Sequence, residues 1–212
     1  MSRTEVETKP AASTEPIEAD TLPKLLLRNC EKWGDRVAFR QKDLGVWQEW
    51  TWRDVYNETK YLCLGLISLG LKRGETVAII GENEPENFLA HYAVQAAGAK
   101  VVCLYPDVTP PEALYLWDNS ESVFIICEDQ EQVDKALEVK DQLHRVRKII
   151  YWDPRGMWKY TDPILMRFAE VQELGYQYEK EHPGAFEASI AQGKREDCLL
   201  YTSDAADEGL GV

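Results

Sequence analysis

The sequence predicts an α/β fold in which helices flank a doubly wound, mostly parallel sheet, preceded by a small N-terminal β-hairpin. Three observations lead to this prediction. Short, nearly continuous apolar runs are typical of strands that are covered on both faces. Helical segments separate these runs, and such alternation specifies a parallel sheet. Two extended segments ahead of the first run are joined by a turn, as in a hairpin. The four apolar runs are residues 76–80, 101–104, 123–127 and 149–152.

The hairpin and the long helix behind it are predicted from turn and cap residues. Residues 37–40 and 47–50 are the two extended segments, and Leu44-Gly45 lies at the turn between them. Thr51 is a suitable N-cap for the long amphipathic helix that follows, and Gly70 a suitable residue just beyond its end. These elements should precede the first buried strand.

The other helices are predicted from helical spacing of apolar residues behind a cap. Residues 1–19 show no such spacing and are rich in Pro, Thr, Glu and Ala, so we expect a disordered tail. Structure should begin at Asp20-Thr21, where a cap precedes a helix that has Pro23 in its first turn and stops near Trp33-Gly34. The later helices are expected at residues 85–97, 110–118, 130–143 and 163–174, followed by a polar stretch at 176–192 with a break at 182–184.

Composition excludes several classes of function. The 212 residues carry a formal net charge of −13, whereas a nucleic-acid partner requires a basic surface. The five cysteines and three histidines do not have zinc-ligand spacing, and Cys103 and Cys127 lie in apolar runs typical of buried thiols. No apolar core of a secretion signal is present, and no apolar run approaches the ~20 residues of a membrane span. We expect a reduced, cytoplasmic protein, for which peripheral contact with a membrane stays open.

Residues with recognisable chemistry are few. The Walker, GxGxxG, GxSxG and HExxH motifs do not occur. Ligands of doubly wound sheets lie beyond the carboxyl ends of the strands. Those ends are residues 81–83, 105–107, 128–129 and 153. We interpret residues 105–107 as a turn, Asn83 and Glu84 as helix caps, and Trp47, Trp50 and Trp52 as packing residues of the hairpin. Composition and periodicity therefore lead only to an acidic α/β domain.

Five segments nevertheless occur in an informative order. They are WTWRDV at 50–55, LGLKRGETVA at 69–78, ENEPE at 82–86, AAGA at 96–99 and LYP at 104–106. Together they resemble the adenylate-forming (AMP-dependent) synthetase and ligase superfamily, closest to its bacterial long-chain fatty-acid–CoA ligases. The family would place this chain in the N-terminal domain of such an enzyme.

The resemblance spans roughly residues 21–201, and it implies that residues 20–197 form part of the N-terminal domain of an AMP-dependent synthetase. In that family, a carboxylate attacks the α-phosphate of ATP in the presence of Mg²⁺, giving acyl-AMP and pyrophosphate. The thiol of coenzyme A then displaces AMP. The implied small-molecule partners are therefore a fatty acid, ATP and CoA.

The resemblance also implies one candidate site. The family's ATP-phosphate loop reads YTSGTTGxPKG, and Tyr201, Thr202 and Ser203 match its opening. Asp204 then occupies a glycine position, and two alanines follow where the family has threonines. A carboxylate repels phosphate, and a Cβ obstructs the close backbone approach that glycine allows. We expect this chain alone to be inactive, with no catalytic residue or metal ligand, and to bind none of ATP, Mg²⁺ and CoA tightly.

The last residues raise a separate hypothesis. Residues 198–208 look like the in-frame translation of a sequencing adaptor, so residues 198–212 would be non-native and the native sequence would end near Asp197.

Two alternative functions remain open. One is a ligase of the same superfamily for an aryl, short-chain or amino acid. The other is a non-catalytic α/β binding or regulatory domain.

Overall fold

The computed structural model describes residues 19–195, 197, 200 and 201. Of the expected disordered tail, only Ala19 is among them, and the expected non-native tail is described only at Leu200 and Tyr201. The α-helices are α1 (Leu22–Trp33), α2 (Trp52–Ser68), α3 (Pro85–Ala96), α4 (Pro110–Asn119), α5 (Gln130–Val139), α6 (Phe168–Glu181) and α7 (Ala185–Ala191), with 3₁₀ turns η1 (Lys140–Gln142) and η2 (Met157–Lys159). The strands are β1 (Val37–Asp43), β2 (Val46–Thr51), β3 (Thr76–Ile80), β4 (Lys100–Leu104), β5 (Ser122–Cys127), β6 (Lys148–Tyr151), β7 (Leu165–Arg167) and β8 (Leu200–Tyr201).

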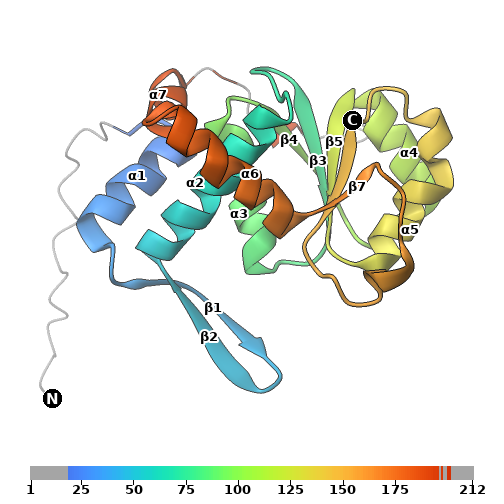
Figure 1. The fold of residues 1–212 in the computed structure, drawn as a ribbon, viewed down its shortest axis with the longest axis horizontal. Helices are drawn as coiled ribbons and strands as arrows, with labels where there is room; N and C mark the ends of the chain where they lie inside the picture. Colours follow the sequence, from blue (N-terminus) through green and yellow to red (C-terminus); the bar gives the residue numbers. More distant parts are fainter. Residues whose placement is uncertain (1–18, 196, 198–199, 202–212) are drawn as a thin grey trace, which may run out of the picture.

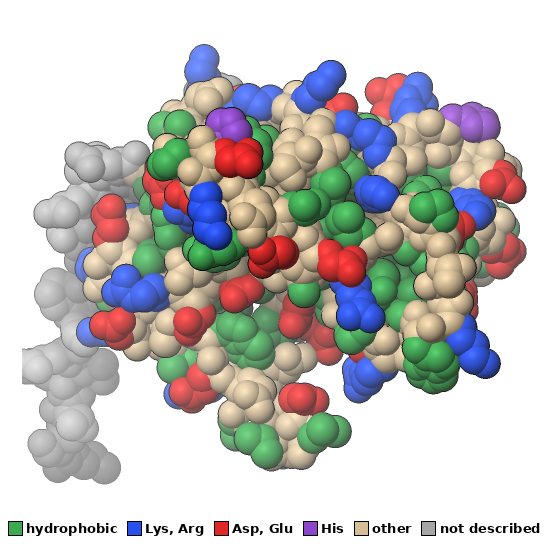
Figure 2. Space-filling model, in the orientation of Figure 1, with side chains coloured by type: hydrophobic (Ala, Val, Ile, Leu, Met, Phe, Trp, Pro, Cys, Tyr) green, Lys and Arg blue, Asp and Glu red, His purple; other side chains and the backbone are tan. Residues whose placement is uncertain are grey.

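The hairpin forms where the sequence predicts it. β1 and β2 pair antiparallel, and Leu44 and Gly45 between them have φ angles of 45° and 85°, as a tight two-residue turn requires. The hairpin projects from the body (Figure 1), and hydrophobic side chains gather at its tip (Figure 2). Trp47 is 62% exposed, so its expected role in packing is wrong, whereas Trp50 and Trp52 do pack against the core.

The main sheet is parallel and doubly wound, as predicted. Its strand order is β7-β6-β5-β3-β4-β8, and every pairing between neighbours is parallel. From β3 the chain first moves to β4 on one side, and then crosses to β5 on the other side. The reversal places the topological switch point between β3 and β5, where such sheets commonly bind ligands.

Two hydrophobic cores fill the spaces on either side of the sheet. Val77, Ile79 and Val101 belong to the core that lies under α1, α2, α3, α6 and α7, whereas Ala78 and Ile80 belong to the core under α4 and α5. The alternation follows from the twofold period of a strand, in which successive side chains point to opposite faces. Figure 1 shows the resulting three layers, with the sheet between two sets of helices.

The region after β6 corrects one prediction. A helix was expected over residues 163–174, but Leu165–Arg167 form strand β7 and the helix runs over Phe168–Glu181. The backbone of β7 pairs with β6, Ile150 opposite Met166, so a neighbouring strand decides the conformation of a short apolar run. The predicted break at 182–184 is confirmed, because α6 ends at Glu181 and α7 begins at Ala185. The helix expected to Leu143 ends earlier, in the 3₁₀ turn η1.

Caps account for most of the correct helix starts. Thr51 accepts a hydrogen bond from the Asp54 backbone N–H, while the Asp54 carboxylate accepts from the Thr51 backbone N–H, which satisfies two otherwise unpaired donors. Thr21 likewise accepts from the backbone N–H of Lys24. Glu84 occupies the N-cap position of α3, but its side chain makes no capping hydrogen bond. The expected capping role of the Glu84 side chain is therefore wrong.

Candidate functional site

The carboxyl ends of β3, β5 and β6 meet in a tightly packed turn. The backbone N–H of Glu82 donates to the Glu128 carboxylate over 2.6 Å. A Cβ on Gly81 would lie 2.6 Å from the Trp152 ring and 2.7 Å from the Glu128 Cβ. Only glycine leaves room at position 81, where φ is also +157°. The switch point between β3 and β5 is thus filled by protein side chains.

Glu84 ties this turn to the hairpin. Its carboxylate accepts from the indole N–H of Trp152 over 2.9 Å and from the amide of Gln41 over 3.0 Å. Burial raises the pKa of Glu86 and of Glu128, and neighbouring carboxylates raise both further. Within the described residues, no three of these acidic side chains, or of Cys and His, are grouped so that they could hold a metal ion. Glu84 and Glu128 connect elements at this edge through their hydrogen bonds.

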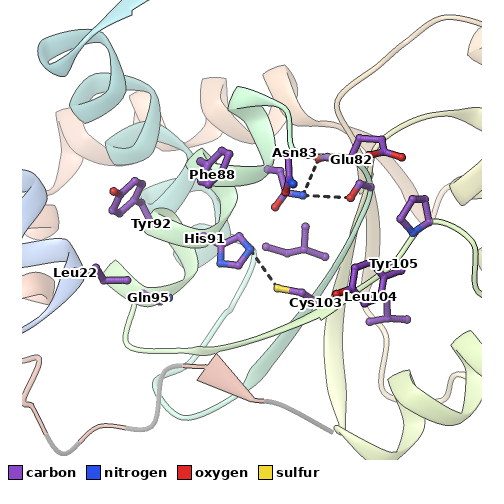
Figure 3. A pocket seen from close by; sticks show the side chains of 14 residues that line it. Leu22, Glu82, Asn83, Phe88, His91, Tyr92, Gln95, Cys103, Leu104 and Tyr105 are labelled. Atoms are coloured by element: carbon purple, nitrogen blue, oxygen red, sulfur yellow. Dashed lines mark hydrogen bonds between the residues drawn. The ribbon is translucent and has the colours of Figure 1, made fainter. Parts of the chain in front are cut away.

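A cavity of about 650 Å³ opens beside the turn, at the carboxyl ends of β3 and β4. Ile79 lines it from the sheet, and one wall is the face of α3 that carries Phe88 and Tyr92 (Figure 3). Leu22 of α1 lies at the far side. The volume falls within the roughly 300–1,000 Å³ typical of ligand pockets.

His91 and Cys103 both line this cavity and contact each other (Figure 3), with 3.2 Å between the ring Nε2 and Sγ. Cys127 is buried as predicted, but Cys103 is exposed, which corrects the expectation of a buried thiol. Cys103 lies on the same sheet face as Val101, and the cavity leaves that position uncovered. The surrounding protein still raises the pKa of Cys103 to about 11 and lowers that of His91. The pair is therefore uncharged near neutral pH.

The residues predicted from the ATP-phosphate loop are only partly described. Tyr201 is the last residue of β8, and its backbone pairs with Val102 of β4. Thr202 and Ser203 lie outside the described residues. Because β8 is parallel to β4, β8 ends at the edge of the sheet where Leu104 borders the cavity. Neither described residue of β8 lines the cavity, so the predicted phosphate loop stays a prediction.

A signal for this cavity is present in the sequence. Phe88, His91, Tyr92 and Gln95 have the i, i+3, i+4, i+7 spacing of one helix face, and all four line the cavity. Such a stripe ordinarily packs into a core, so it does not by itself indicate a cavity. The predicted turn at residues 105–107 is confirmed.

The decisive comparison is with a family model. The model described as AMP-binding enzyme matches residues 26–203. The chain belongs to the AMP-binding enzyme family. The resemblance read from the order of motifs is thereby confirmed, and so is the expected fold class.

Similar proteins agree with this assignment. The chain is 30% identical over 210 residues to the long-chain-fatty-acid–CoA ligase ACSBG2 of Xenopus laevis, covering 98% of this chain and 27% of that protein. It is 26% identical over 194 residues to the ligase ACSBG1 of Homo sapiens, covering 91% of this chain and 26% of that protein. The chain thus spans about a quarter of the length of these relatives.

Solved structures show the same fold. A crystal structure of the anthranilate CoA ligase AuaEII with anthranoyl-AMP matches 71% of this chain and 27% of that chain, with a TM-score of 0.63 and 21% identity. A long-chain-fatty-acid CoA ligase structure from Rhodopseudomonas palustris matches 71% of this chain and 36% of its own, with a TM-score of 0.61 and 23% identity. Among the described residues, no helix has the length and apolar character needed to cross a bilayer.

Proposed function

We propose that this chain is the first part of an ATP-dependent, AMP-forming acyl-CoA ligase that activates long-chain fatty acids. The observation that carries the proposal is the family match over residues 26–203 together with relatives named as long-chain-fatty-acid–CoA ligases. In the longer protein, the fatty acid carboxylate attacks the α-phosphate of ATP to form acyl-AMP and release pyrophosphate. The CoA thiol then attacks the acyl carbon and AMP leaves.

The described residues do not fit ATP or Mg²⁺. The cavity is lined by no Lys or Arg within the described part of the chain, and no group there of three or more Cys, His, Asp or Glu suits a metal ion. Tight binding of ATP, Mg²⁺ and CoA therefore belongs, in this proposal, to the rest of the longer protein. The contribution of this chain is the parallel sheet in which β8 pairs with β4.

The sequence after β8 supports inactivity of the 212-residue chain by itself. Asp204 follows Ser203, where the family has glycine. A carboxylate about 4 Å from a phosphate oxygen is repelled by about 1 kcal/mol even in bulk water, and by more in a partly dry site. We propose that this chain alone catalyses neither half of the reaction.

The experiment has two stages. Genomic DNA is read past codon 197, and a continuation encoding Gly-Thr-Thr-Gly and then Pro-Lys-Gly is expected. The encoded protein is then purified and assayed for AMP and acyl-CoA with palmitate, with benzoate and acetate as controls. We expect AMP release that depends on palmitate and CoA. A continuation without the glycine-rich loop, or AMP release with benzoate or acetate but not palmitate, would contradict the proposal.

A further inference from the structure

We propose that the tip of the β1–β2 hairpin inserts into the surface of a zwitterionic lipid bilayer. The tip consists of Leu44, Val46 and Trp47, whose side chains are 93%, 60% and 62% exposed. They lie at the end of a hairpin that projects from the body (Figure 1), where hydrophobic side chains gather (Figure 2). Apolar side chains that are exposed as a group mark an interaction site, whereas single ones do not.

The folding of the hairpin does not explain the leucine at its turn. Leu44 has a φ of 45° and Gly45 a φ of 85°, and two-residue turns of this kind favour Asn or Asp before Gly. A bulky apolar residue is strained in this left-handed region. Leu44 gains no burial in return, because it is 93% exposed. Its side chain therefore indicates a contact outside the described part of the chain.

The dimensions of the tip suit the interfacial layer of a bilayer. Val46 and Trp47 follow the turn directly, so the tip is about 10 Å long at about 3.4 Å per residue. Interfacial segments bury their apolar side chains about 5–10 Å deep, and tryptophan is enriched at that level. Lys42 is paired with Trp47 across the two strands, so its ammonium group can reach lipid phosphates while its aliphatic stem stays beside the tip.

The small size of the tip favours a bilayer over a protein partner. A stable protein–protein interface uses about 20–30 residues on each side, whereas this tip offers three apolar side chains on a narrow ribbon. A second copy of the chain would face the same limit. A bilayer requires only that the tip be long enough to enter it, because lipid then surrounds the side chains on all sides.

The charges of the hairpin favour a zwitterionic surface. Residues 40–49 contain two basic residues, Arg40 and Lys42, and two acidic residues, Asp43 and Glu49, so the segment is neutral. Arg40 and Glu49 also pair with each other over 2.8 Å. The whole chain carries a formal net charge of −13, which the negative surface potential of anionic lipids would repel. Phosphatidylcholine offers the same apolar layer without that repulsion.

The base of the hairpin is fixed to the body. The rings of Phe39 and Phe88 lie 5.7 Å apart, and the Gln41 amide donates to the Glu84 carboxylate over 3.0 Å. Insertion of the tip therefore holds the whole domain at the membrane surface. The choice of lipid as the partner rests in part on the proposed function, because a long-chain acid itself partitions into bilayers.

Vesicle flotation tests the inference. The longer protein and the 212-residue chain are each mixed with phosphatidylcholine vesicles and centrifuged through a density gradient, and the bound fraction gives a partition coefficient. Leu44→Asn/Trp47→Gln should lower this coefficient about tenfold or more, because burial of one large apolar side chain already changes an equilibrium by about that factor. Trp158→Gln is the matched control, since Trp158 is 79% exposed but lies in η2. It should change binding less than about threefold.

Two single variants separate insertion from folding. Trp47→Phe keeps an apolar ring at the tip, so it should bind vesicles within about threefold of the parent. It should nevertheless lose most of the quenching of tryptophan fluorescence by brominated phosphatidylcholine. Leu44→Asn should be at least as stable as the parent in urea, because asparagine suits the positive φ. Weaker vesicle binding by this variant therefore cannot come from unfolding.

Three results would overturn the inference. They are no vesicle binding by the longer protein, vesicle binding that Leu44→Asn/Trp47→Gln leaves unchanged, and a dimer in sedimentation that this variant abolishes without weakening vesicle binding. The third result would assign the tip to a second copy of the chain.

The two proposals fail separately. If the longer protein activates palmitate but does not bind vesicles through the tip, the ligase proposal stands and the bilayer proposal is wrong. If it binds vesicles through the tip but activates no fatty acid, the tip still contacts lipid and the ligase proposal is wrong.

Discussion

Gly175→Ala tests how closely α2 and α6 pack. A Cβ on Gly175 would lie 1.7 Å from the Tyr61 carbonyl oxygen, and one on Gly65 would lie 1.9 Å from the Val171 carbonyl oxygen. Ordinary contact begins near 3.4 Å, so the helices would have to separate by about 1.7 Å at Gly175. Alanine in a helix interior gains about 0.5–1 kcal/mol over glycine, whereas overpacking costs about 1–3 kcal/mol. Because the obstacle is backbone, we expect the upper end of that cost and a net loss of about 2 kcal/mol.

The assay is urea unfolding followed by far-ultraviolet circular dichroism, from which the free energy of unfolding is extrapolated to water. Gly193→Ala is the matched control, since its Cβ would meet nothing closer than the Ile190 carbonyl oxygen at 3.2 Å. That variant should change the free energy of unfolding by less than about 1 kcal/mol. A Gly175→Ala protein as stable as the parent, or more stable, would refute the close packing of the two helices.

Two further substitutions test the helix cap at Thr51 and the contact just ahead of the start of β3. Thr51→Ala should cost about 1 kcal/mol at pH 7. The hydrogen bond from the Thr51 hydroxyl, and then that from its backbone N–H, lower the pKa of Asp54. The stabilisation is therefore present above the unfolded pKa of about 3.9 and is lost as pH falls through the folded pKa. The difference in stability between parent and variant should shrink between pH 7 and pH 3, and a constant difference would contradict the linkage. Arg147→Lys should lower the stability measured by thermal unfolding by about 1 kcal/mol. Lysine cannot donate at the same time to the Gly70 carbonyl and the Glu75 carboxylate, each 2.6 Å from the Arg147 guanidinium. An unchanged melting temperature would show that this double contact is dispensable.

The elements that local patterns specify were predictable from the sequence. The four apolar runs form buried strands, and Thr21 and Thr51 start helices, because an apolar run and a cap residue each act within a few positions. Strand β7 was not predictable, since three residues become a strand only through pairing with β6. The close contact of Gly175 with α2 was not predictable either, because no neighbouring residue in the sequence indicates it.

The candidate site was less predictable than the fold. The rule that ligands lie beyond the carboxyl ends of parallel strands predicted at which edge of the sheet the site lies. The structure does have a cavity at that edge. The meeting of His91 and Cys103 did not follow, because it depends on the distance between α3 and the sheet. The same distance leaves Cys103 exposed although its strand pattern predicts burial.

Palmitate-dependent exchange between pyrophosphate and ATP is the most direct measurement of the central claim, that this chain is the first part of an AMP-forming fatty-acid ligase. The longer protein read from genomic DNA and the 212-residue chain are compared under the same conditions. Exchange by the longer protein, and none by the 212-residue chain, is the predicted result. Exchange by the 212-residue chain alone, or a longer protein that shows none with any long-chain acid, would contradict the account.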